Sequence, residues 1–201
     1  KEYNISREEQ DLFALESQRR AKEATRSGRF ANEIVPIGHI DADNGIRHDQ
    51  NLAMLAKLKP RYEGGTATPG NSSQISDGAV ALIITSEEFA EKYGLPVLAE
   101  MSSKKTAVAG CDPAMMGLGP VKAVQQILNK NEMRISDIDV METNEAFASV
   151  VLAQLKDLKQ MGLDMNRVNV NGGAIALGHP ISASGARLVL TCAKELNYRD
   201  A

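Results

Sequence analysis

Apolar and polar positions in the first third of the chain predict two helices separated by turns. Ser6 and Glu9 have the spacing of a helix capping box, and the apolar residues that follow recur at helical intervals. Gly28 supplies a stop signal, so the first element is predicted to be a long amphipathic helix. A shorter helical pattern follows at 51–59 and ends at Pro60.

Beyond a loop rich in Gly, Ser and Asn that ends near residue 77, short apolar runs alternate with amphipathic helical patterns. The runs typical of strands are 78–85, which we expect to be buried, 96–102, 137–143 and 167–171, with a short extended run earlier at 33–37. The helical patterns are 120–130, 144–161 and about 182–196. Strands that alternate with helices predict an α/β layer built on one sheet.

Composition narrows the class of protein without identifying it. With 201 residues, of which 43% are hydrophobic and 24% charged, the chain is long enough for one domain or one and a half. The net charge of −3 gives no broad cationic surface for nucleic acid, and no apolar run is long enough to span a membrane. The two cysteines lack metal-type spacing, which favours a reducing compartment such as the cytoplasm. The first residues resemble neither a signal peptide nor a start, so we expect the chain to begin inside a longer protein.

The segment 169–187 carries the strongest candidate for chemistry. Its glycines, including Gly178, permit unusual dihedral angles and place His179 just before a predicted helix. A helix N-terminus disfavours an imidazolium, so a histidine there is expected to be neutral and ready to accept a proton. The alternative, at equal weight, is a tight turn in which His179 only hydrogen-bonds the loop.

Asn144 directly follows the predicted strand 137–143 and opens a predicted helix. The spacing favours a structural role for Asn144 as the helix N-cap. The alternative is that its side-chain amide holds a water or a carbonyl oxygen at the sheet edge, where α/β proteins collect ligands.

The remaining candidates are weaker. The helix start at 117–120 can bind phosphate, yet it lacks the GxGxxG and P-loop patterns. The loop 70–74 can donate hydrogen bonds to an amide-rich ligand, or it can serve only as a connector. Arg47 and His48 form a small cationic spot, which can bind a phosphate or remain solvated. Cys192 lies in an apolar helical stripe and Cys111 has no basic neighbour, so neither is predicted to be a nucleophile; no zinc-type spacing is present.

Five motifs, in order along the chain, resemble those of the thiolase family: 5–21, 70–79 (GNSSQISDGA), 116–120 (MGLGP), 144–148 (NEAFA) and 169–187 (NVNGGAIALGHPISASGAR). The resemblance implies interconversion of a 3-ketoacyl-CoA plus CoA with acetyl-CoA plus a shortened acyl-CoA. It also implies an α/β thiolase-like fold of two βαβαβαββ halves, with a CoA-covering loop domain in the first. On this template, 1–73 is part of the loop domain, 74–94 ends the first half, and 95–201 is most of the second half, incomplete at its end.

The resemblance also implies roles for individual residues. His179 matches the histidine that activates the nucleophilic cysteine and contributes to an oxyanion hole, and Asn144 matches the asparagine that holds the water of that hole. The CoA-contacting positions fall on Arg47 and Ser73, and the acyl-pocket positions on Met116 and Phe147. CoA is a substrate, so neither a cofactor nor a metal is expected, and the full-length protein is expected to be a homodimer or homotetramer.

The chain departs from the family pattern at the positions that matter most for turnover. The family's two catalytic cysteines would lie before Lys1 and after Ala201, so the chain alone is expected to be inactive. Gln74 and Ser182 each stand where glycine is common. A non-catalytic acyl-CoA-binding or scaffold subunit is the main alternative, and a decarboxylating ketoacyl synthase is a weaker one.

Overall fold

The computed structural model describes residues 2–199, and its regular structure is helical. The α-helices are α1 (Arg7–Arg26), α2 (Leu52–Ala56), α3 (Glu87–Tyr93), α4 (Gly119–Lys130), α5 (Ala148–Gln160), α6 (Ala174–Leu177) and α7 (Ile181–Arg199). Short 3-10 turns connect them at η1 (Ser103–Lys105), η2 (Pro113–Leu118), η3 (Ile135–Asp137) and η4 (Met165–Arg167). In this part of the chain no helix combines the length and apolarity needed to cross a bilayer.

The helices whose signals are local in sequence form as predicted. At the start of α1, the Ser6 hydroxyl accepts from the Glu9 amide at 3.1 Å and the Glu9 carboxylate accepts from the Ser6 amide at 2.6 Å. This reciprocal pair confirms the predicted capping box. The predicted helix at 120–130 is confirmed as α4, with Pro120 in its first turn, and the last helical pattern is confirmed as α7.

The N-cap prediction for Asn144 is wrong, because α5 begins four residues later, at Ala148, with Phe147 as its cap. The residues before the helix are instead held by the loop that contains Asn71 and Ser73. The Ala148 amide donates to the Asn71 carbonyl, and the Ser73 amide donates to the Ala146 carbonyl, each at 2.9 Å. These non-local bonds keep the chain extended past Asn144 and leave its side chain free of capping.

The predicted strands do not assemble into a sheet within residues 2–199, where only isolated bridges occur. One of them, a parallel bridge between Met141 and Val168, does bring two of the predicted strands together. The segment 78–85 makes no backbone hydrogen bond among the described residues, and Ile83 and Ile84 are 92% and 72% exposed. The prediction of a buried strand there is therefore wrong, since an extended segment becomes a strand only when a neighbour pairs with its backbone.

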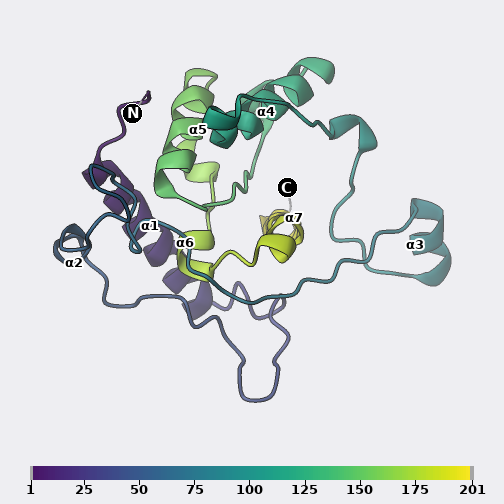
Figure 1. Cartoon of the computed structure of the whole chain (residues 1–201). Coiled ribbons are helices and arrows are strands. Elements are labelled where there is room, and N and C mark those ends of the chain that lie inside the picture. Colours follow the sequence, from purple (N-terminus) through teal and green to yellow (C-terminus); the bar gives the residue numbers. More distant parts are fainter. Residues whose placement is uncertain (1, 200–201) are drawn as a thin grey trace.

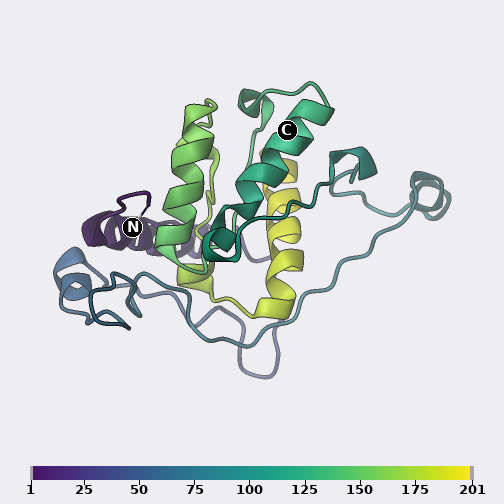
Figure 2. The same ribbon diagram turned by 45° about the horizontal axis from the view of Figure 1, so that its top comes forward.

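The core lies between α4 and α5, which pack side by side (Figure 2). Its buried residues come from these helices and from the turns that follow them: Val121, Leu128, Ile135, Val151, Leu155, Leu158, Leu163 and Val168. In Figure 1, α1 runs along α5 and α6, and small residues such as Ala14, Ala21 and Ala148 allow this close approach. The segments around α3 run outside this packed unit (Figures 1 and 2).

Candidate active site

His179 and Asn144 meet although 35 residues separate them in sequence. Asn144 Nδ2 lies 3.2 Å from His179 Nε2. The Oδ1 atom of Asn144 is buried and has no hydrogen-bond partner among the described protein groups. The pair therefore offers an imidazole nitrogen and an amide oxygen at one place, which is the type of group that handles protons and small polar ligands.

Ser184 holds the other side of the His179 ring. The Ser184 hydroxyl lies 2.6 Å from His179 Nδ1 and donates its single hydrogen to the Pro180 carbonyl at 3.0 Å. The Ser184 oxygen is then an acceptor, so the arrangement places the ring proton on Nδ1. Nε2 is left as the basic nitrogen that faces Asn144.

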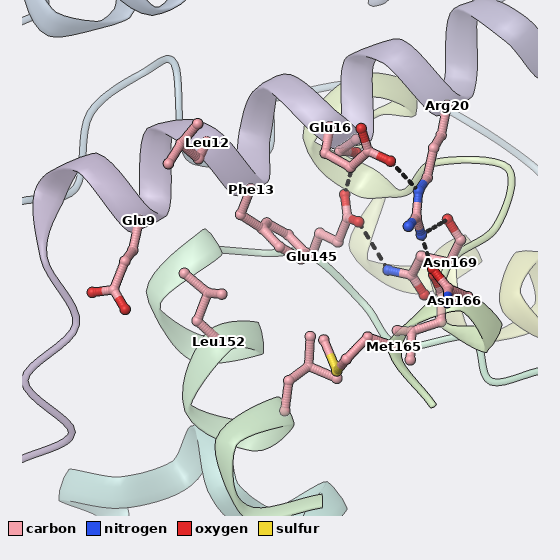
Figure 3. Close-up of a pocket in the computed structure, with 13 residues that line it drawn as sticks. Glu9, Leu12, Phe13, Glu16, Arg20, Glu145, Leu152, Met165, Asn166 and Asn169 are labelled. Atoms are coloured by element: carbon pink, nitrogen blue, oxygen red, sulfur yellow. Dashed lines mark hydrogen bonds and ion pairs between the residues drawn. The ribbon is translucent and has the colours of Figure 1, made fainter. Parts of the chain in front are cut away.

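A buried carboxylate, Glu145, organises the loop that leads to His179 (Figure 3). It accepts from the Ser17 hydroxyl at 2.6 Å, from Asn169 Nδ2 at 2.8 Å and from the Ile175 amide at 3.2 Å. Burial raises the pKa of Glu145, while the bonds from Ser17 and Asn169 act in the opposite direction. The glycine at 173 is required here, because a Cβ would lie 2.3 Å from the Glu145 carboxyl carbon.

Sequence reasoning missed this network and the role of Ser184. Ser17, Asn169 and Glu145 come from three distant segments, so no local pattern connects them. The sequence offered two signals of this network: an acidic residue next to Asn144, and small residues alternating with polar ones in α1. Both patterns are also typical of an exposed helix, so neither indicates a buried network.

Among the described residues, no hydrogen bond joins either cysteine to His179. Burial raises the pKa of the Cys192 thiol, and the nearby carboxylates Glu142 and Glu195 raise it further. Cys111 lies in a loop and its thiol donates to the Met116 carbonyl at 3.7 Å. Within residues 2–199, no three His, Cys, Asp or Glu side chains gather in a metal-binding arrangement.

The other predicted site residues are attached to neighbouring segments of the fold. Ser73 and Phe147 belong to adjoining segments, since Ser72 pairs with Phe147 in an isolated bridge. Phe147 and Met116 expose 46% and 75% of their surface. The Arg47 amide donates to the Gln18 side chain at 2.7 Å, which attaches its segment to α1.

Two hollows lie along α1, and neither is lined by His179 or Asn144. One, of about 520 Å³, is the cationic hollow: it is lined by Arg47, Arg19 and Lys22, and also by Glu16, which forms an ion pair with Arg19 at 2.7 Å. The other, of about 390 Å³, is a groove between α1 and α5 with a mainly apolar floor (Figure 3). The cationic hollow is the one whose charge suits a phosphorylated ligand.

Comparison with known proteins identifies the family. Residues 95–201 match the family described as "Thiolase, C-terminal domain", and residues 1–88 match "Thiolase, N-terminal domain". A 3-ketoacyl-CoA thiolase of Marinobacter nauticus is 48% identical over 95% of this chain and 51% of its own length. An acetyl-CoA acetyltransferase of Chromobacterium violaceum is 46% identical over 99% of this chain and 52% of its own length.

Solved structures agree with the sequence comparison. The human mitochondrial 3-ketoacyl-CoA thiolase is 42% identical, with a TM-score of 0.93, and the match covers 100% of this chain and 51% of that one. The same human enzyme in complex with CoA also gives a TM-score of 0.93. The fold is thus thiolase-like, and the chain spans about half the length of the curated relatives it matches. This chain belongs to the thiolase family.

Proposed function

We propose that this chain is part of a thiolase that carries out the reversible Claisen exchange between a 3-ketoacyl-CoA plus CoA and acetyl-CoA plus a shortened acyl-CoA. The observation that supports this most directly is the approach of Asn144 to His179 at 3.2 Å, with Ser184 on the opposite side of the ring. A histidine fixed from both sides is preorganised for proton transfer and for oxyanion stabilisation.

In this proposal His179 first takes a proton and then donates it. Nε2 accepts the proton of a cysteine thiol, which lies outside this chain, and the resulting thiolate attacks the keto carbonyl. The carbon–carbon bond breaks, and a second thiol, also outside this chain, protonates the carbanion so that acetyl-CoA leaves. That second thiolate takes the proton of the CoA thiol, the acyl group passes from the cysteine to the CoA sulfur, and the released cysteine thiolate takes its proton back from His179. His179 N–H and a water on Asn144 stabilise the negative charge on the thioester oxygen.

The CoA side of the site is proposed to include Arg47 and Ser73. Arg47 lines the cationic hollow, which supplies charge for phosphate groups, and Ser73 lies in the loop joined to the Asn144 segment. The exposed side chains of Met116 and Phe147 are proposed to meet the acyl chain. In the same proposal, 1–73 is part of the loop domain, 74–94 ends the first half of the fold, and 95–201 is most of an α/β second half. The full-length protein is proposed to be a cytoplasmic homo-oligomer.

A non-catalytic acyl-CoA-binding or scaffold subunit is the second candidate. It is favoured by one observation, that among the described residues neither Cys111 nor Cys192 is hydrogen-bonded to His179. The acyl-CoA-binding form of this candidate also requires CoA binding, so turnover by the longer protein is what separates it from a thiolase.

Calorimetric titration of the 201-residue chain with CoA tests the binding part of the proposal. We expect wild type to bind CoA and Arg47→Ala to bind at least about tenfold more weakly, because a charge-assisted phosphate contact is lost. Glu91→Gln, a change on the exposed helix α3, serves as the control and should leave the affinity unchanged. Equal affinity of Arg47→Ala and wild type would remove Arg47 from the site.

A further inference from the structure

Gln74 lies where three segments that carry proposed site residues meet. Its Nε2 atom donates to the Ala176 carbonyl at 3.0 Å, on the helix that precedes His179. Gly45, two residues before Arg47, packs directly on the same side-chain amide. A Cβ at Gly45 would lie 1.9 Å from Gln74 Nε2 and 2.7 Å from the Ala176 oxygen.

A second contact joins the same loop to His179 itself. The His179 amide donates to the Ser76 hydroxyl at 2.9 Å, and that hydroxyl donates to the Gln74 carbonyl at 3.2 Å. Gly178 has a φ of +94° and no room for a side chain, because a Cβ would lie 2.4 Å from Ser76 Oγ. The backbone on either side of His179 is therefore fitted closely to residues 71–78, which we call the strap.

The strap is anchored at its other end to the Asn144 segment. The Ser73 amide donates to the Ala146 carbonyl, and the Ala148 amide donates to the Asn71 carbonyl, both at 2.9 Å. The Asn71 side chain is buried and donates to Asp11 of α1 at 2.9 Å, which fixes this end to the packed helices. One short segment thus contacts the backbones that present both Asn144 and His179.

We propose that Gln74 is a positioning residue, which acts through its bond to Ala176 to couple the strap to the His179 loop. The identity of the ligand, CoA, rests on the proposed function. The coupling itself rests on the contacts of Gln74 and Ser76 described above. CoA binding at Ser73 and Arg47 changes the position of His179 through the hydrogen bond from Gln74 to Ala176. Misplacement of a catalytic group by about 1 Å can reduce the rate about 10²-fold, so such coupling matters for turnover.

Gln74→Glu is the sharpest variant for testing this role. It preserves the length and shape of the side chain but replaces the N–H donor with an oxygen that faces the Ala176 carbonyl. Gln74→Asn is a second variant, which keeps the amide but is one methylene too short for the same bond. Gln125→Ala is the matched control, because among the described residues the side chain of this exposed glutamine of α4 makes a single hydrogen bond, to Met161 Sδ at 3.8 Å.

Hydrogen exchange of the His179 amide in the ligand-free 201-residue chain provides the first readout. We expect exchange at least about tenfold faster in Gln74→Glu and Gln74→Asn than in wild type, since the Ser76 contact then opens more often. The ¹⁵N ring signals of His179 should broaden in both variants, and Gln125→Ala should match wild type. Wild-type exchange in either folded variant, as judged by an unchanged melting temperature, would overturn the proposal.

Titration of the same proteins with CoA provides the second readout. Wild type should shift the His179 ring signals, whereas Gln74→Glu should bind CoA within about threefold of wild-type affinity and show less than half of that shift. An equal shift in both proteins would contradict the coupling. If wild type does not bind CoA, the proposed function fails, while the ligand-free exchange rates still decide whether Gln74 positions His179.

Discussion

At the scale of single residues, the hydrogen bond between His179 and Ser184 assigns a role to a serine that lies five positions along the chain. Its oxygen accepts from Nδ1, so it stabilises the ring when Nε2 takes a proton. In the longer protein, Ser184→Ala should lower kcat for thiolysis about tenfold and change KM for CoA less than twofold. Steady-state kinetics with CoA varied measures both constants. A larger change in KM than in kcat would contradict this role.

A second residue-scale prediction concerns pH. Burial raises the pKa of Glu142 to about 8, although the charge of Arg187 acts in the opposite direction. Because this pKa is above the ordinary value of 4.5, the folded chain binds the proton more tightly than the unfolded chain. The resulting stabilisation is complete below pH 4.5 and is lost as the pH rises toward 8.

Urea unfolding between pH 5 and pH 8 measures this effect. Wild type should lose stability across the interval, and Glu142→Gln should show a shallower loss because its side chain cannot ionise. The exposed Glu91→Gln should follow the wild-type slope. Parallel slopes for Glu142→Gln and wild type would show that Glu142 is not responsible.

At the scale of elements, we expect alanine substitutions at two glycines of neighbouring helices to have opposite effects on the free energy of unfolding. A Cβ at Gly173, just before α6, would lie 2.3 Å from the Glu145 carboxyl carbon, whereas Gly185 in α7 has nothing within 4 Å. Gly173→Ala should therefore lower the free energy of unfolding by about 1–3 kcal/mol. Gly185→Ala should be neutral or raise it by up to about 1 kcal/mol, because alanine favours a helix interior. Urea midpoints compare the two, and equal destabilisation would refute the packing argument.

How much of the fold the sequence could predict depends on how far apart along the chain the interacting residues lie. The capping box of α1 and the proline start of α4 act through residues a few positions apart, so both helices were predictable. The extended segments depend on partners elsewhere, and within residues 2–199 the one bridge that joins two predicted strands is between Met141 and Val168. The site followed the same rule. His179 and Asn144 were found through motifs, while the Glu145 network and the bond of Gln74 to Ala176 connect residues too distant for any local pattern.

At the scale of the whole molecule, the segment between the strap and α4 presents apolar side chains without cover. Val108 is 96% exposed, and Ile83 and Ile84 lie on an extended backbone without hydrogen-bond partners among the described residues. Exposed apolar segments of this type favour association through strand edges. The purified chain should therefore elute in size-exclusion chromatography at a mass that increases with concentration, and Ile83→Lys with Ile84→Lys should reduce the increase. A wild-type monomer at all concentrations would contradict this expectation.

The proposed function requires that His179, held by Asn144 and Ser184, acts in a thiolase reaction with cysteines supplied from outside these 201 residues. The measurement is the loss of the ketoacyl thioester when acetoacetyl-CoA is incubated with CoA, for the chain alone and for the longer protein with and without His179→Ala. We predict no turnover by the chain, turnover by the longer protein, and a decrease of at least about 10² in the variant. Turnover by the chain that disappears on substitution of Cys111 or Cys192, or unchanged thiolysis by His179→Ala, would show that His179 does not have the proposed role.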